Sequence, residues 1–560
     1  MQNTLLNIKN LNISTTKNGE KITLVKGSTF SIQKNEICAV VGESGSGKSL
    51  TALAVMGLLQ KEILNVSGSI KFDGNEIINL SEKEFQNIRG IDIGMIFQEP
   101  MSALNPSMRC GNQVAEVLQQ HESFSKKEIK SKVLELFEQV RLPNPDRIYS
   151  AYPHEISGGQ KQRIMIAMAI ACQPKLLIAD EPTTALDVTV QKDILLLLKD
   201  LQKQTGMSLL LISHDLALVS EFADQVIVMF KGEIVEQGTT KAMFQNPKET
   251  YTKALIASRP STKERLKTLP TIADFIDNSI DTTIVSPSER KAVHEKLYNQ
   301  TPLLEVINVE KEYFSKAGWF SKSNTFKAVD GVSFKVYPGE TLGLVGESGC
   351  GKSTLGNAIL QLDKATAGQI LFKGKNITKL HKSELRALRK DIQLIFQDPY
   401  ASLNPRLQVG AAIMEPMKVH NIGSSQKERK EKVISLLEKV GLSATDFNKY
   451  PHEFSGGQRQ RIGIARTIAL EPKLIICDES VSALDISVQA QVLNLLNDLK
   501  DNFGFTYIFI SHDLSVVKYM SDQLLVMNKG RIEEIGDADE IYNHPKKTYT
   551  QKLIAAIPKG

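Results

Sequence analysis

The sequence predicts two tandem domains of the α/β class, each built around a mostly parallel sheet. The chain of 560 residues is too long for one ordinary domain. Short apolar runs such as "EICAVV" (36–41) and "KLLIAD" (175–180) alternate with amphipathic stretches such as "KEIKSKVLELFEQV". This alternation is typical of buried parallel strands connected by helices. In addition, five sequence blocks occur twice in the same order, which indicates two homologous halves.

The spacing of these blocks defines the domain limits. "GESGSGKS" at Gly42 returns as "GESGCGKS" at Gly346, 304 residues later, and "IFQEPMSALNP" returns as "IFQDPYASLNP" 299 residues later. The blocks "YPHEISGGQKQRI", "DEPTTALD" and "ISHDL" all return, with few changes, 298 residues later. We therefore predict domains over residues 1–260 and 303–560. The polar, charged stretch 261–302, with prolines near both ends, predicts a linker.

Composition excludes several classes of protein. The net charge of +5 is small, and no concentrated basic stripe is visible, so no nucleic-acid partner is expected. No window approaches the 18 consecutive apolar residues of a membrane-spanning helix, and the N-terminus has no signal-peptide pattern. The five cysteines lack paired spacing, which argues against a disulfide framework or a zinc site.

The first block predicts a loop that binds nucleotide phosphates. It fits the pattern G-x-x-x-x-G-K-[ST], follows an apolar strand and opens a predicted helix. The glycines allow the backbone N–H groups to point inward at phosphate oxygens, and the lysine reaches the terminal phosphates. The residues expected to bind ATP are Gly42, Ser44, Gly45, Gly47, Lys48 and Ser49 in the first half, and Gly346, Ser348, Gly349, Gly351, Lys352 and Ser353 in the second.

Acidic residues at strand ends predict a magnesium site and a general base. Asp180 and Asp478 end apolar strands, where a carboxylate can hold Mg²⁺ opposite the loop serine. The next residues, Glu181 and Glu479, are placed to orient or deprotonate the attacking water. The predicted metal ligands are Ser49, Gln98 and Asp180 in the first half, and Ser353, Gln397 and Asp478 in the second.

Two further positions recur after apolar strands. His214 and His512 each follow such a strand, and their imidazoles are expected to hydrogen-bond the γ-phosphate. The block "SGGQ" opens a predicted helix in both halves, so that it forms a second anion site. Its residues are Ser157, Gly158, Gly159 and Gln160, and Ser455, Gly456, Gly457 and Gln458.

Taken together, these blocks resemble the ATP-binding cassette (ABC) family over nearly the whole chain. They match its Walker A loop, Q-loop, signature, Walker B, D-loop (Ala185–Asp187 and Ala483–Asp485) and switch histidine. The resemblance implies two P-loop NTPase domains, each with a RecA-like core, an antiparallel β subdomain and a helical subdomain. It also implies head-to-tail pairing, in which Lys48 shares a site with Ser455–Gln458 and Lys352 shares one with Ser157–Gln160. Both sites are expected to bind ATP and Mg²⁺ and to hydrolyse ATP.

A closer resemblance concerns the segments "EPMSALNP", "DPYASLNP", "NPKETYTKALIASRP" and "HPKKTYTQKLIAAIP". They look like the oligopeptide/dipeptide importer subfamily, and most like its fused members, which serve peptide-type substrates such as microcin C or glutathione. This resemblance implies two integral-membrane permease subunits, an indirect extracytoplasmic solute-binding protein, and a peripheral location on the cytoplasmic face of a bacterial inner membrane. The alternative is a twin-cassette translation factor that acts on the ribosome, although the linker here is shorter and less basic than in that class.

One departure from the family concerns the base of the nucleotide. Family members usually stack adenine on an aromatic residue some twenty residues before Walker A. The first half has no aromatic residue before Phe30, which is too close, so its adenine contact is in doubt. The second half offers Phe320 and Phe326, and the sequence does not decide between them.

Overall fold

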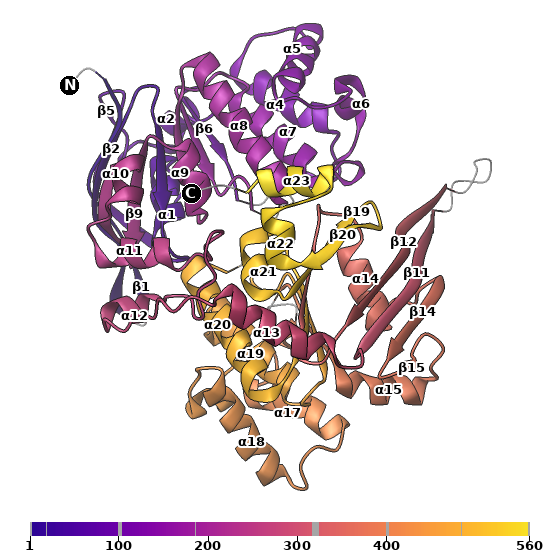
Figure 1. Cartoon of the computed structure of the whole chain (residues 1–560). Coiled ribbons are helices and arrows are strands. Elements are labelled where there is room, and N and C mark those ends of the chain that lie inside the picture. Colours follow the sequence, from indigo (N-terminus) through magenta and orange to yellow (C-terminus); the bar gives the residue numbers. More distant parts are fainter. Residues whose placement is uncertain are drawn as a thin grey trace. The chain divides into compact units, whose positions relative to one another are not determined.

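The computed structural model describes residues 3–17, 19–98, 103–184, 186–315, 324–398, 402–482 and 484–557 (Figure 1). The described residues form two compact units, one ending at Ile256 and the other spanning Ala257–Ile557. The strands of the two units follow the same order, and so do most of their helices. The predicted α/β class and the tandem repeat are therefore confirmed, and each unit is described by itself below.

A mostly parallel sheet of six strands forms the centre of each unit, and its inner strands are the predicted apolar runs. The strand orders are β10-β9-β3-β8-β7-β6 and β16-β17-β18-β13-β19-β20. In the first unit the strands are β3 (Ile37–Val41), β6 (Ile93–Ile96), β7 (Leu176–Asp180), β8 (Ser208–Ile212), β9 (Gln225–Phe230) and β10 (Glu233–Thr239). In the second they are β13 (Thr341–Val345), β16 (Ile392–Ile395), β17 (Leu474–Asp478), β18 (Thr506–Ile510), β19 (Gln523–Asn528) and β20 (Arg531–Asp537). Only β10 and β20 run antiparallel to their neighbours.

An antiparallel sheet packs on each central sheet. Its strands are β1 (Thr4–Lys17), β2 (Glu20–Gln33), β4 (Leu64–Phe72) and β5 (Asn75–Glu76), and in the second unit β11 (Leu304–Ser315), β12 (Asn324–Val336), β14 (Ala367–Phe372) and β15 (Lys375–Asn376). Apolar side chains of the two sheets share one core, in which Leu6 and Ile8 of β1 pack with Val40 of β3. This burial is what fixes the two sheets to each other.

Helices complete each unit. The predicted helical insert is present as α4 (Cys110–His121), α5 (Lys126–Gln139), α6 (Pro145–Ser150) and α7 (Gly158–Ile170), and as α17 (Val409–Val419), α18 (Gln426–Lys439) and α19 (Gly456–Ile468). Around the central sheets lie α1 (Lys48–Val55), α2 (Glu82–Gln86), α8 (Val188–Thr205), α9 (Leu216–Phe222), α10 (Thr240–Gln245) and α11 (Thr250–Ala257). Their counterparts are α14 (Lys352–Ile359), α15 (Lys382–Asp391), α20 (Ile486–Phe503), α21 (Leu514–Met520), α22 (Ala538–Asn543) and α23 (Thr548–Ala555). Within the described residues, no helix has both the length and the hydropathy needed to cross a membrane.

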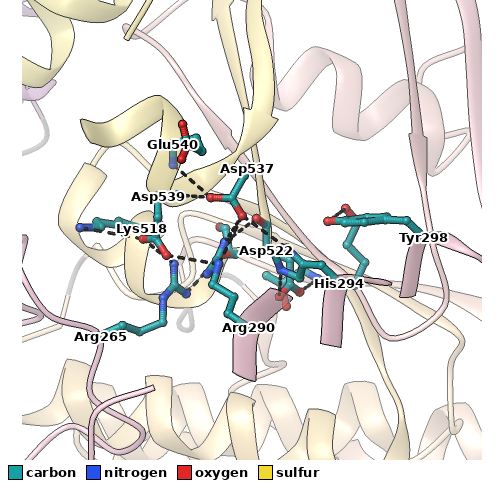
Figure 2. A network of polar contacts seen from close by, with 12 residues as sticks. Arg265, Arg290, His294, Tyr298, Lys518, Asp522, Asp537, Asp539 and Glu540 are labelled. Atoms are coloured by element: carbon teal, nitrogen blue, oxygen red, sulfur yellow. Dashed lines mark hydrogen bonds and ion pairs between the residues drawn. The ribbon is translucent and has the colours of Figure 1, made fainter. Parts of the chain in front are cut away.

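The segment predicted as a linker contains two helices, α12 (Ile272–Ile276) and α13 (Pro287–Tyr298), and belongs to the second unit. Figure 2 shows its arginines and His294 pointing toward a group of carboxylates. Arg290 pairs with Asp537 at 3.0 Å and with Asp539 at 3.2 Å. In the repeat, these two aspartates correspond to Thr239 and Lys241 of the first half. Because a threonine and a lysine cannot pair with an arginine, these ion pairs are specific to the second unit.

Behind these pairs, Asp522 ties the segment to the central sheet. Its carboxylate accepts from the Thr341 backbone N–H and from Lys500, both at 2.8 Å, and lies 3.3 Å from His294. Burial opposes ionisation, but Lys500 and His294 hold the pKa of Asp522 well below its usual range. Thr341 is the first residue of β13, the strand that leads into the second phosphate loop.

The neighbouring Glu340 makes the second unit sensitive to pH. It is fully buried, accepts from the Tyr337 N–H at 2.7 Å and from the Tyr298 hydroxyl at 3.3 Å, and burial raises its pKa from 4.5 to about 7. The folded state therefore binds the proton more tightly than the unfolded chain does, so stability falls as pH rises from 4.5 to 7. The difference between the folded and unfolded pKa of Glu340 corresponds to about 3 kcal/mol of folding free energy.

We expect Glu340→Gln to remove this pH dependence and to stabilise the second unit at pH 8 relative to the wild type. Hydrogen exchange of β13 amides between pH 5 and 8, corrected for the intrinsic rate, measures it. The lowered pKa of Asp522 changes stability only at pH values below its unfolded pKa of 3.8, which lie outside the range of this measurement. An unchanged pH dependence in the variant would show that Glu340 is not the group responsible.

Candidate active sites

The phosphate loop of each unit leaves the central sheet between β3 and α1, or β13 and α14, as the sequence predicts. Gly47 and Gly351 precede the helices with φ of 100° and 109°, a left-handed conformation that favours glycine. Gly42 also has a positive φ, and a Cβ there would lie 2.0 Å from the carbonyl oxygen of Met229 in β9. The loop therefore packs directly on the neighbouring strand, which leaves no room for a side chain at its first position.

The loop lysines are held by carbonyl oxygens at the start of the same loop. Lys48 Nζ donates to Gly42 O and Glu43 O, both at 2.8 Å. In the second unit, Lys352 Nζ donates to Gly346 O at 2.7 Å and to Glu347 O at 3.0 Å. Both side chains are buried. The positive charge is thus fixed inside the curve of the loop, where a phosphate group would sit.

A hydroxyl and a carboxylate meet at the ends of β7 and β17, the strands whose last residues are Asp180 and Asp478. Ser49 donates to Asp180 Oδ1, and Ser353 donates to Asp478 Oδ1, each at 3.1 Å. Burial raises the pKa of both aspartates, against the effects of the serine and the loop lysine. This set of hard oxygen donors fits Mg²⁺. Among the described residues, no cluster of three or more histidine, cysteine or acidic side chains offers a different metal site.

The following glutamate collects three polar partners in the first unit. Glu181 Oε2 accepts from Gln98 Nε2 at 2.9 Å and from the Thr184 hydroxyl at 3.0 Å, and it lies 3.3 Å from His214 Nδ1. Burial raises the pKa of Glu181, but His214, Thr184 and Lys48 together lower it to about 2. The carboxylate is therefore ionised at neutral pH.

The second unit repeats this arrangement. Glu479 accepts from Gln397 Nε2 at 2.6 Å and lies 3.6 Å from His512 Nδ1. The hydrogen bond with His512 lowers the pKa of Glu479, against burial. Burial lowers the pKa of His512, but Glu479 more than offsets this and the net shift is upward. Both shifts favour the charged pair.

Both glutamates have an unusual backbone. Glu181 and Glu479 have φ of 47° and 48°, which costs a non-glycine residue about 1–2 kcal/mol. The backbone N–H of each still donates to the carbonyl of the adjacent strand, Ile212 O or Ile510 O. The fold thus holds a strained residue beside the loop in both units, which is common where a side chain must be aimed at a substrate.

The signature residues form a separate local structure. Ser157 caps α7 by accepting from the Gln160 N–H at 3.3 Å, and the Gln160 side chain accepts from the Ser157 N–H at 3.0 Å. Ser455 and Gln458 make the same reciprocal bonds at the start of α19. Each unit thus brings together its loop lysine, serine, glutamine, carboxylates and histidine, whereas the reciprocal bonds between the signature serine and glutamine are local to the start of α7 or α19.

Some predicted positions fall outside the described residues. Among them are Phe320, one of the two candidates for adenine stacking, and Ala185 and Ala483 of the D-loops. Phe326 lies on β12, where it pairs with Tyr313 of β11. The sequence analysis did not single out Tyr313, the aromatic residue that lies opposite Phe326. Its hydroxyl donates to Asp363 at 2.6 Å and contacts Thr354 of α14. The repeat aligns Tyr313 with Thr15, so the first unit has no aromatic ring at this position.

Comparison with known proteins agrees with this arrangement. The family profile described as "ABC transporter" matches residues 25–184 and 329–482. The profile "Oligopeptide/dipeptide transporter, C-terminal region" matches residues 235–278 and 534–560. The glutathione import ATP-binding protein GsiA of Escherichia coli (strain K12) is 46% identical over 99% of this chain and 89% of its own length, and the Shigella sonnei protein of the same name gives the same values.

Among solved structures, the ADP- and phosphate-bound dimer of the ATP-binding cassette MJ0796 is 30% identical, covers 42% of this chain and 98% of its own, and has a TM-score of 0.38. The sequence-based prediction of an ABC importer ATPase is confirmed by the profiles and the relatives, which give no support to the ribosomal alternative. The chain carries two nucleotide-binding domains, each followed by the C-terminal region of the peptide-importer subfamily, and it belongs to the ABC transporter family.

Proposed function

We propose that this chain drives the uptake of a peptide or a peptide-like molecule of the glutathione type across a bacterial inner membrane, from its cytoplasmic face. The observation that carries the proposal is the end-to-end match to a glutathione import ATP-binding protein. Both C-terminal regions typical of peptide importers lie within the chain. A solute-binding protein on the outer side would deliver the cargo to two permease subunits, and this chain would power them.

In each site we assign ATP to the phosphate loop and Mg²⁺ to the serine–aspartate pair with the adjacent glutamine. Bound Mg²⁺ would neutralise charge that develops on the phosphates. Lys48 and Lys352 bind the terminal phosphates, and Glu181 and Glu479 accept the proton of the attacking water. His214 and His512, each already beside its glutamate, hold the carboxylate in place and contact the γ-phosphate. The signature of the opposite half completes each site, as head-to-tail pairing requires.

A groove in the second unit is the proposed contact for a permease. It has a volume of about 510 Å³ and is lined mainly by apolar residues between α15, β16 and α17. Phe396, which borders the groove and is 45% exposed, directly precedes Gln397, the residue that holds Glu479. A permease segment seated here would contact Phe396, and the next residue, Gln397, donates a hydrogen bond to Glu479, the proposed catalytic carboxylate.

The first unit repeats the exposed apolar pair that marks this groove. Leu362 and Phe396 are 57% and 45% exposed, and their counterparts Leu58 and Phe97 are 38% and 44% exposed. Leaving large apolar side chains in water at matched positions is unfavourable unless a partner covers them. One such surface on each unit is what two permease subunits would need.

Purification of the tagged chain from detergent-solubilised membranes, followed by mass spectrometry, tests the proposal. We expect two multi-spanning permease subunits to copurify. The double variant Leu58→Asp/Leu362→Asp, which changes both surfaces, should reduce their recovery at least tenfold, whereas Ile276→Asp, which changes an apolar side chain that is 67% exposed outside the groove, should not. Recovery of ribosomes without any membrane protein would contradict the proposal.

A further inference from the structure

A tyrosine from the region that follows each nucleotide-binding domain reaches the phosphate loop. Tyr251 lies in α11 and Tyr549 in α23, the short helices within "NPKETYTKAL" and "HPKKTYTQKL". Both residues fall within the matches to the oligopeptide/dipeptide C-terminal region and outside the matches to the ABC transporter profile. They therefore belong to what this subfamily adds to the cassette, rather than to the cassette itself.

Each tyrosine hydroxyl accepts a hydrogen bond from the loop backbone. The Glu43 N–H donates to Tyr251 Oη at 3.3 Å, and the Glu347 N–H donates to Tyr549 Oη at 3.1 Å. Tyr251 is buried and Tyr549 is half-buried. Because the same bond forms in both units from residues about 200 positions apart in the chain, it is a repeated feature of the fold.

The residue that donates this bond is also one whose carbonyl accepts a hydrogen bond from the loop lysine. The carbonyl of Glu43 accepts from Lys48 Nζ, and the carbonyl of Glu347 accepts from Lys352 Nζ. A chain of contacts thus runs from the tyrosine hydroxyl, through one loop residue, to the ammonium group that would meet the phosphates. On its other side, the loop is packed against the Met229 or Met527 carbonyl at its first glycine.

The helices that carry the tyrosines are themselves fixed to the central sheet. The Glu236 carboxylate of β10 accepts from the Lys248 and Glu249 N–H groups at 2.9 and 3.1 Å, at the start of α11. The Glu534 carboxylate of β20 accepts from the Lys546 and Lys547 N–H groups at 3.0 and 3.2 Å. These bonds leave the helix little freedom to move relative to the sheet and hence to the loop.

We propose that Tyr251 and Tyr549 are positioning residues for ATP binding, through which the C-terminal regions set the geometry of the phosphate loops. The hydroxyl fixes the loop peptide, and the peptide fixes the lysine. Loss of the hydroxyl should weaken the binding of phosphates and leave the hydrolytic groups in place, because Glu181 and Glu479 are held by Gln98 and Gln397 and by the neighbouring histidines. The proposal needs only the ATPase activity and is independent of the cargo or the permease.

The test is the double variant Tyr251→Phe/Tyr549→Phe in the full-length chain, because phenylalanine keeps the ring and removes only the oxygen. We expect KM for ATP to rise about fivefold, the equivalent of one ordinary hydrogen bond in each site, with kcat within twofold of the wild type. The inhibition constant of inorganic tripolyphosphate, measured as a competitor, should rise by the same factor. That of adenosine should not change, because the defect lies at the phosphates.

The matched control is Tyr507→Phe. It removes a buried tyrosine hydroxyl that donates to Leu496 O at 3.1 Å, away from both loops, and should leave KM and both inhibition constants unchanged. If the double variant is poorly folded, Glu236→Gln/Glu534→Gln supplies the second test, with a smaller rise of KM in the same direction. Unchanged KM and tripolyphosphate inhibition in a folded double variant, or an equal rise in Tyr507→Phe, would overturn the proposal.

Discussion

Replacing both Glu181 and Glu479 by glutamine is expected to slow ATP hydrolysis by about 10²–10⁴-fold, the usual contribution of a general base, while ATP binding is retained. An amide keeps the shape of the side chain and can still bond with the glutamine and histidine around it, but it does not take a proton from water. Single-turnover hydrolysis and equilibrium binding of labelled ATP measure the two effects separately.

The control for this double variant is Glu233→Gln, which neutralises an exposed carboxylate that forms an ion pair with Lys26. It should hydrolyse ATP at the wild-type rate. Each single variant should leave the other site active and retain up to half of the turnover. Near-normal hydrolysis in the double variant would refute the assignment of these glutamates as bases.

The pairing of half-sites gives the second large effect. If Lys48 shares a site with Ser455, then Lys48→Ala/Ser455→Arg damages one site twice and should hydrolyse ATP about as fast as Lys48→Ala alone. Lys48→Ala/Ser157→Arg damages both sites and should be slower by about 10²-fold or more, because each of its sites lacks groups that stabilise the transition state. Lys352→Ala combined with either arginine variant should show the reverse pattern.

Two further measurements control for loss of stability and for coupling between the two sites. Ser157→Arg and Ser455→Arg each remove a helix cap, which costs about 1 kcal/mol, so their unfolding midpoints should fall equally. If damage to one site silences the other, ATP trapped in the Glu181→Gln/Glu479→Gln background still separates the pairs. We expect one ATP per chain for Lys48→Ala/Ser455→Arg and none for Lys48→Ala/Ser157→Arg, and the opposite order would exclude head-to-tail pairing.

Much of the fold could be predicted because its signals are local. The run "EICAVV" is buried β3, "KLLIAD" is buried β7, and Lys48 opens α1 directly after the predicted loop. These elements depend on hydrophobic periodicity and on glycine, which a short window of sequence contains. The roles assigned to the site residues remain predictions, but the strand ends that carry them do meet at one edge of each sheet.

The structural features that the sequence did not predict depend on contacts between segments that are far apart in the chain. The stretch 261–302 is polar and reads as a linker, yet Arg290 bonds to residues more than 230 positions later. The bonds from Glu43 to Tyr251 and from Gln98 to Glu181 also join separate elements. No periodicity marks such pairs. For Tyr251 and Tyr549, the one available signal was the repetition of "TYT" after both domains.

The docking of residues 261–302 onto the second unit also changes the effective length of the tether between the two halves. α11 ends at Ala257, and the carbonyl of Thr262 already accepts a bond from Lys518. Only residues 258–261 lie between these points, so the chain reaches at most about 18 Å from one to the other. Over such a span, each half is present at millimolar effective concentration for the other. If the two halves pair as proposed, their re-encounter after hydrolysis is an intramolecular event, independent of how many copies of the protein the cell contains.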